Sequence, residues 1–100
     1  MLVHTVYFWL KDERQGDGDL QNFRAGLETL ADIECANAVH IGTPAATDPR
    51  PVIDTSYTFA LTVLLDSLED QAAYQVHPLH KKFVENFAPY WDKVLIYDAD

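Results

Sequence analysis

Hydrophobic and polar residues alternate in several separate stretches of the chain with the two-residue period of β-strands. Residues 2–10 and residues 57–65 show this period most clearly, and both are rich in β-branched and aromatic residues. Residues 91–97 show it over a shorter length, and residues 37–43 show it more weakly. The pattern therefore predicts four strands.

A helical period separates the first two predicted strands, because apolar residues there recur at intervals of three and four positions. These residues are Leu20, Phe23, Leu27 and Leu30. The helix is expected to reach about Asp32 and to be capped at its start by Asp17 or Asp19. Gly26 costs about 1 kcal/mol relative to alanine inside a helix, and we expect it to allow close packing on the sheet.

A pair of helices is predicted between the last two strands. Ser67 and Asp70 match the Ser-x-x-Asp/Glu capping pattern that marks a helix N-terminus. That helix should end near His77, because the residue before a proline is biased away from helical backbone angles. Pro78 can then open a second, short helix that ends at Pro89. The inward-facing residues of this helix are Phe83, Val84 and Phe87.

The order strand, helix, strand, strand, helix, strand predicts an α+β protein with the ferredoxin-like βαββαβ fold, in which the helices cover one face of an antiparallel sheet. Both sets of alternating side chains in residues 2–10 are largely apolar, whereas a sheet covered on one side only would leave its other face polar. We therefore expect a homodimer through the open face of the sheet, a dimeric α/β-barrel. Residues 44–54 contain three prolines and are expected to form an exposed loop.

The length of 100 residues fits one domain spanning residues 1–100. The formal net charge is −9, from 7 Lys and Arg against 16 Asp and Glu. Nucleic acids and anionic membrane surfaces select basic proteins, so we expect no nucleic acid and no membrane as a partner. An uncharged or cationic small molecule, or another protein, suits this charge better.

Cysteine usage and the apolar runs point to a cytoplasmic location. Cys35 is the only cysteine, so no internal disulfide can form. The first residues lack the charged and apolar regions of a signal peptide. The longest apolar run, residues 59–65, is too short to cross a bilayer.

Candidate chemistry is concentrated around the predicted helix break at Pro78, where Tyr74, His77 and His80 stand close together. His80 would lie in the first turn of the second helix, whose partial positive charge disfavours imidazolium, so its neutral ring could act as a general base. Tyr74 could donate a hydrogen bond to a ligand carbonyl or enolate. Alternatively, His80 ties the helix junction to a backbone carbonyl and Tyr74 is a buried aromatic residue with a satisfied hydroxyl.

The other histidines have more ordinary explanations. His77 is expected to bond to the backbone at the helix break. His4 shares a strand face with apolar residues, and it is either a satisfied core residue or a polar anchor beside His80. We expect no metal and no cofactor, because Pro78 separates His77 from His80, no carboxylate stands at a ligand spacing, and no nucleotide-binding motif occurs.

Aromatic residues supply enough apolar surface to line a cleft between the helices and the sheet, although in a small domain such residues are by default core. The polar groups of this cleft would be Tyr74, His80 and His4. The catalytic candidates are Tyr74 and His80, and the ligand-binding candidates are His4, Phe8, Phe59, His77, Phe83, Phe87 and Trp91.

The chain resembles the stress-responsive α/β-barrel family, also called dimeric α/β-barrel or Dabb proteins. The features that carry the resemblance are the opening strand at residues 3–8, the Tyr74-x-x-His77-Pro78-x-His80 motif, Phe83, and the ending at residues 91–98. The resemblance implies a ferredoxin-like protomer whose sheet closes against a second copy into a barrel. Some members of the family assemble into larger, very stable oligomers.

One plant branch of this family acts as a cofactor-free polyketide cyclase, in which the tyrosine and the second histidine of the motif do the acid–base work. The resemblance implies these roles for Tyr74 and His80. That branch also places a histidine in the third strand, where this chain has Phe59, so the same reaction is not implied. Two functions stay open: binding of a small apolar or carbonyl-containing molecule with cyclase-, isomerase- or lyase-like activity, or a non-enzymatic stress-related homo-oligomer.

Overall fold

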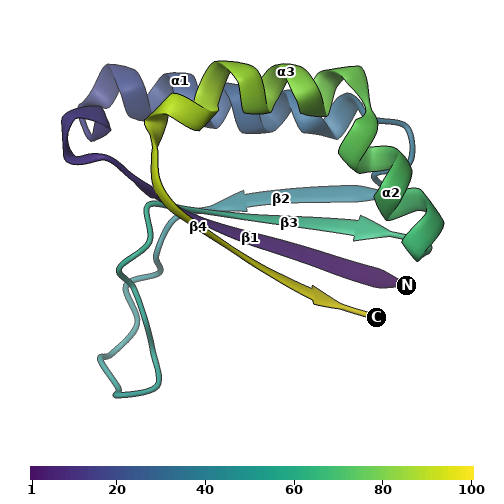
Figure 1. Ribbon diagram of the computed structural model, residues 1–100. Helices are drawn as coiled ribbons and strands as arrows, with labels where there is room; N and C mark the ends of the chain where they lie inside the picture. The colour runs from purple at the N-terminus through teal and green to yellow at the C-terminus, as the bar shows by residue number, and fades with distance from the viewer.

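The computed structural model describes residues 1–100 and contains a four-stranded antiparallel sheet with the strand order β2-β3-β1-β4. The strands are β1 (Leu2–Leu10), β2 (Ala38–Gly42), β3 (Phe59–Leu65) and β4 (Trp91–Ala99). The helices, all on one face of the sheet (Figure 1), are α1 (Asp17–Glu28), α2 (Leu68–Val76) and α3 (Pro78–Phe87). The predicted ferredoxin-like α+β fold is confirmed. None of the helices is both long and apolar enough to cross a membrane.

Strand β1 lies inside the sheet, antiparallel to β3 on one side and to β4 on the other. Its even-numbered residues are buried and its odd-numbered residues are half-buried, as the alternation predicts. The register places His4 opposite Val63 of β3 and Asp98 of β4. Because residues directly opposite each other share a face of the sheet, His4 and Asp98 meet on its helix-covered side.

Helix α1 starts differently from the prediction. Gly16 is its N-cap residue and no side chain caps it, so the expectation of a cap at Asp17 or Asp19 was wrong. Both aspartates lie inside the first turn, where a carboxylate interacts with the positive end of the helix dipole. The last turn of the predicted helix, Thr29–Asp32, is a 3₁₀-helix.

Gly26 packs against α3 rather than against the sheet, which corrects the expectation from the sequence. A Cβ atom at Gly26 would lie 2.3 Å from Cε2 of Phe87, far inside van der Waals contact. The Phe87 ring is held there because it stacks on Phe83 and packs edge-on against Phe23 and Tyr90. Gly26 therefore lets α1 and α3 approach each other closely.

The helix break at Pro78 forms as predicted. Ser67 caps α2 by accepting a hydrogen bond from the backbone N–H of Asp70 at 3.1 Å. His77 has the extended backbone expected before a proline, with φ −61° and ψ 141°, and Pro78 opens α3. These signals are local, because each depends on the backbone geometry of neighbouring residues.

The connection between β2 and β3, residues 43–58, is a long loop that leaves the sheet on the side opposite the helices (Figure 1). Strand β3 begins at Phe59, two residues later than predicted, so Tyr57 belongs to this loop. Strand β4 continues to Ala99, two residues beyond the predicted end.

Phe23 of α1 lies at the centre of the core and is completely buried. Its ring packs on aromatic rings from the sheet and from the α3 region at centroid distances of 5.1 to 6.0 Å: Phe8, Phe59, Phe83, Phe87 and Tyr90. This aromatic cluster joins both layers of the fold, and it supports the adjoining site.

Candidate functional site

A cavity of about 220 Å³ lies between the helices and the sheet. Its polar lining residues are His4, Tyr74, Gln75 and His80. The rest of the lining is apolar or aromatic: Val6, Phe8, Leu30, Leu61, Phe83, Val84, Trp91, Val94 and Ile96. A few polar groups converging in an apolar cavity are typical of a small-molecule site.

Tyr74, in the last turns of α2, places its hydroxyl in this region without a hydrogen-bond partner in the protein. The side chain is completely buried, and this burial raises the pKa of the phenol well above its ordinary value. The hydroxyl therefore stays protonated and can donate a hydrogen bond. A buried donor without a partner costs about 1 to 3 kcal/mol, so a ligand oxygen that accepts this bond would bind favourably.

His80, in the first turn of α3, packs its ring edge-on against Tyr74 with a centroid distance of 4.9 Å. Burial lowers the pKa of the His80 imidazole, and the charge of the neighbouring His4 lowers it further. The ring is therefore neutral at pH 7 and can accept a proton.

His4 approaches Tyr74 from the sheet side, with a ring-centroid distance of 5.8 Å. Its Nδ1 atom lies 2.5 Å from Oδ1 of Asp98, and the imidazole is buried. Because a carboxylate only accepts hydrogen bonds, Nδ1 carries the proton and Nε2 is the ring nitrogen available to a ligand. The ring of Tyr74 thus packs against the imidazoles of both His4 and His80.

Asp98, the partner of His4, was not among the site residues predicted from the sequence. The signal that could have found it is the pairing of the first and last strands, which the ferredoxin-like fold requires. That pairing sets Asp98 directly opposite His4 although the two residues are 94 positions apart.

The structure brings together most of the predicted site residues in one cavity: His4, Phe8, Tyr74, His80, Phe83 and Trp91. Trp91 also has a buried indole N–H without a partner in the protein. Phe59 and Phe87 lie outside the cavity lining, because Phe59 stacks on Phe23 at 5.4 Å and Phe87 fills the space beside Gly26.

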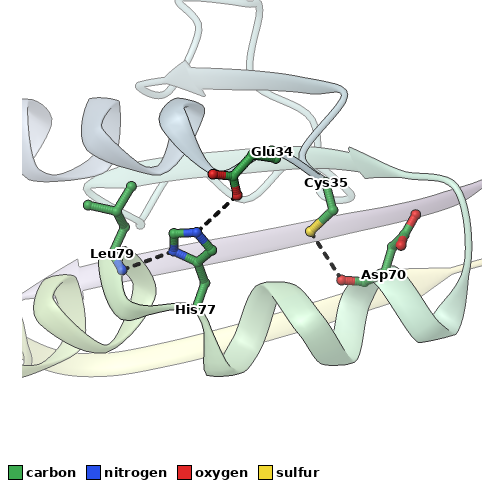
Figure 2. Close-up of polar contacts among 5 residues, drawn as sticks. All are labelled: Glu34, Cys35, Asp70, His77 and Leu79. Carbon is green, nitrogen blue, oxygen red and sulfur yellow. Dashed lines mark hydrogen bonds and ion pairs between the residues drawn. The ribbon is translucent and has the colours of Figure 1, made fainter.

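His77 also lies outside the cavity lining and is engaged at the helix junction instead (Figure 2). Its Nδ1 accepts a hydrogen bond from the backbone N–H of Leu79 at 3.1 Å and so caps α3. Its Nε2 lies 3.1 Å from Oε2 of Glu34 and donates to it, since Nδ1 is the acceptor. The adjacent Cys35 contacts the carbonyl of Asp70 at 3.4 Å, so one turn of the chain touches both ends of α2.

Replacing His77 by alanine is expected to lower the free energy of unfolding by about 1 kcal/mol, the usual loss when an N-cap is removed. His77→Asn should be close to wild type, because the asparagine side chain is an equally good cap. Urea denaturation would measure both variants. Equal destabilisation by alanine and asparagine would contradict a capping role and would point to the ring itself.

The acid–base groups of the cavity are a phenol and imidazoles. No group of three or more His, Cys, Asp and Glu side chains is arranged to hold a metal ion. The residues of the cavity provide hydrogen-bond donors, proton acceptors and apolar surface, and the ring of Tyr74 packs against both His4 and His80.

The family model described as the Stress Responsive A/B Barrel Domain matches residues 2–100. The chain belongs to this family, the Dabb proteins. The resemblance noted from the Tyr74–His80 motif is thereby confirmed. No curated protein sequence gives a significant match.

Solved structures of similar fold cover nearly the whole Dabb chain. The Arabidopsis thaliana protein At3g17210 is 25% identical, with a TM-score of 0.81 over 100% of this chain and 94% of that one. A dimeric ferredoxin-like protein of unknown function from Thermobifida fusca is 21% identical, with a TM-score of 0.78 over 98% and 88%. A hydroxynitrile lyase from Passiflora edulis is 19% identical, with a TM-score of 0.76 over 98% and 90%. The latter two likenesses establish the fold alone.

Proposed function

We propose that this Dabb protein binds a small, apolar, carbonyl-containing molecule in the cavity and transforms it by cofactor-free acid–base chemistry. The observation that carries this proposal is the buried, unpaired hydroxyl of Tyr74 beside the ring of His80 in an apolar cavity. If the motif served only as a stable helix junction in a non-enzymatic stress protein, these side chains would be bonded within the protein, as His77 is.

The proposed reaction begins with proton transfer to His80. Its neutral imidazole removes a proton from the carbon next to the ligand carbonyl, and the electron pair of that C–H bond moves onto the carbonyl oxygen as an enolate. Tyr74 donates its hydrogen bond to this oxygen, and the bond strengthens as negative charge develops there. His80 then returns the proton to the product.

His4 and Asp98 give the same site a second acid–base group. The Asp98 carboxylate accepts the hydrogen bond from Nδ1 and orients the imidazole, so Nε2 is the nitrogen through which His4 would exchange a proton with the ligand. Addition, cyclisation and lyase reactions at a carbonyl all need one group that accepts a proton and another that donates one. The hydroxynitrile lyase among the structural neighbours is a protein of this reaction class.

The size of the cavity limits the ligand. Its volume is about 220 Å³, and an apolar cavity of about 150 Å³ is enough to bind benzene. The proposed ligand is therefore a compact molecule, about the size of one substituted ring, with a carbonyl group that reaches Tyr74.

We also propose that the protein forms a homodimer through the open face of the sheet. The open face carries half-buried apolar and aromatic residues, including Tyr7, Trp9 and Leu95. A second copy would remove this surface from water, at about 25 cal/mol per Å² of apolar area. Three of the structural neighbours, from Thermobifida fusca, Bacteroides fragilis and Jannaschia, are described as dimeric.

The test is an NMR titration of the histidine side chains with and without a panel of aromatic and β-keto compounds. We expect His80 to titrate below the ordinary histidine value of about 6.5 and to shift when one compound class is added. His40, which is exposed on β2, is the internal control and should not respond. If no compound moves the His80 or Tyr74 resonances, the ligand-binding proposal is wrong.

A further inference from the structure

The loop of residues 43–58 is anchored to the open face of the sheet, on the side away from the helices (Figure 1). The indole N–H of Trp9 on β1 donates a hydrogen bond to Oγ of Ser56 at 3.0 Å. The ring of Tyr57 packs edge-on against Tyr7, with a centroid distance of 5.0 Å. The return limb of the loop is thus held on the face that the helices leave uncovered.

The apolar tip of this loop is closed by a backbone turn. The backbone N–H of Ile53 donates to the carbonyl of Arg50 at 3.0 Å, which closes a turn with Pro51 at its second position. Val52 is 78% exposed and Ile53 is 37% exposed. A tip held in a hydrogen-bonded turn loses less conformational freedom when it binds than an open chain would, so its apolar contacts contribute more to affinity.

An aromatic hollow of about 270 Å³ connects the loop to the open face. Asp54 and Tyr57 line it from the loop, and Tyr7, Trp9, Leu95 and Tyr97 line it from the sheet. The apolar tip therefore continues the surface through which we propose that two copies associate.

We propose that residues 50–53 form an arm that packs Val52 and Ile53 against the second copy of this chain. The inference rests on the homodimer proposed above, and it follows from the direction of the loop. When two open faces meet, a loop that extends past its own sheet on that side must run alongside the partner. Each copy has a net charge of −9, so Arg50 in the arm also brings a cation to an acidic partner.

The test compares the Val52→Asp variant with Val76→Asp as a matched control. Val76 is 63% exposed but belongs to α2, away from the loop, so it carries the same kind of change outside the proposed contact. Sedimentation equilibrium should show a dimeric wild type, a dissociation constant raised at least tenfold in the arm variant, and no change in the control.

The outcomes separate the two proposals. A dimeric wild type with an unaffected arm variant overturns the arm and leaves the homodimer standing, whereas a monomeric wild type overturns both. The arm contact is tested independently of the aspartate substitutions with an environment-sensitive dye on Val52→Cys in a Cys35→Ser background. Its emission should shift to the blue as protein concentration rises through the dimer range, and the same dye on Val76→Cys should not respond. An unchanged Val52→Cys emission would also overturn the arm.

Discussion

Replacing His80 by alanine should lower the turnover of the carbonyl compound identified by NMR by about 100- to 10,000-fold, the range attributed to a positioned general base. The compound should still bind, because Tyr74 and the apolar lining of the cavity are retained. Steady-state kinetics and an independent binding titration would measure the two effects. A His80→Ala variant with wild-type turnover would contradict the proposed role.

The pH dependence of kcat/KM is a second test of the role of His80 as a base. Burial and the nearby His4 lower the pKa of His80 below 6.5, so the neutral, proton-accepting ring persists as the pH falls through 6.5. The acidic decline of kcat/KM in the wild type should therefore lie below pH 6.5. The His4→Gln variant lacks the imidazole that helps to lower the pKa of His80. The decline should therefore move toward higher pH in this variant.

The Tyr74→Phe variant tests the role of the Tyr74 hydroxyl as a hydrogen-bond donor. It removes the hydroxyl and leaves the buried ring, so the core should remain intact. Loss of a single donor to a developing oxyanion typically reduces kcat about 100- to 1,000-fold. A variant that lost turnover only through unfolding would show a lowered free energy of unfolding, which separates the two causes.

Replacing Phe23 by alanine is expected to lower the free energy of unfolding by about 3 to 5 kcal/mol. This is a large part of the about 5 to 15 kcal/mol that stabilises an ordinary domain. Phe23 is completely buried and packs on rings from the sheet and from the α3 region. Removing its ring would leave a cavity between the sheet and the helices that the surrounding side chains do not fill. Urea denaturation, followed by circular dichroism, would measure the change.

The control for Phe23→Ala is Leu68→Ala, an apolar truncation at an exposed position of α2. Surface changes of this kind usually stay within about 0.5 kcal/mol. A loss below about 1 kcal/mol for Phe23→Ala would mean that the aromatic cluster rearranges around the space, contrary to the close packing described above.

Local sequence rules placed the four strands to within two residues and predicted the helix junction. Strand β1 has the bounds that its alternation indicates, Ser67 caps α2, and Pro78 breaks the helical segment. These features follow from side-chain periodicity, capping and proline geometry, which act over a few residues. The start of α1 was harder, because Gly16, Asp17 and Asp19 are all acceptable near a helix N-terminus.

The composition of the candidate site was decided by contacts between distant parts of the chain. Asp98 lies beside His4 only because β1 pairs with β4. Phe59 and Phe87 do not line the cavity, because Phe59 stacks on Phe23 and Phe87 packs beside Gly26.

The motif Tyr74-x-x-His77-Pro78-x-His80 could be identified in the sequence, but the separate roles of its tyrosine and two histidines could not. All three polar side chains stand near one helix break, and local rules cannot say which of them is hydrogen-bonded within the protein. Folding engages His77 with Leu79 and Glu34, and it encloses Tyr74 and His80 in the cavity. The physical reason is that burial and hydrogen bonding depend on the neighbours that the tertiary structure supplies.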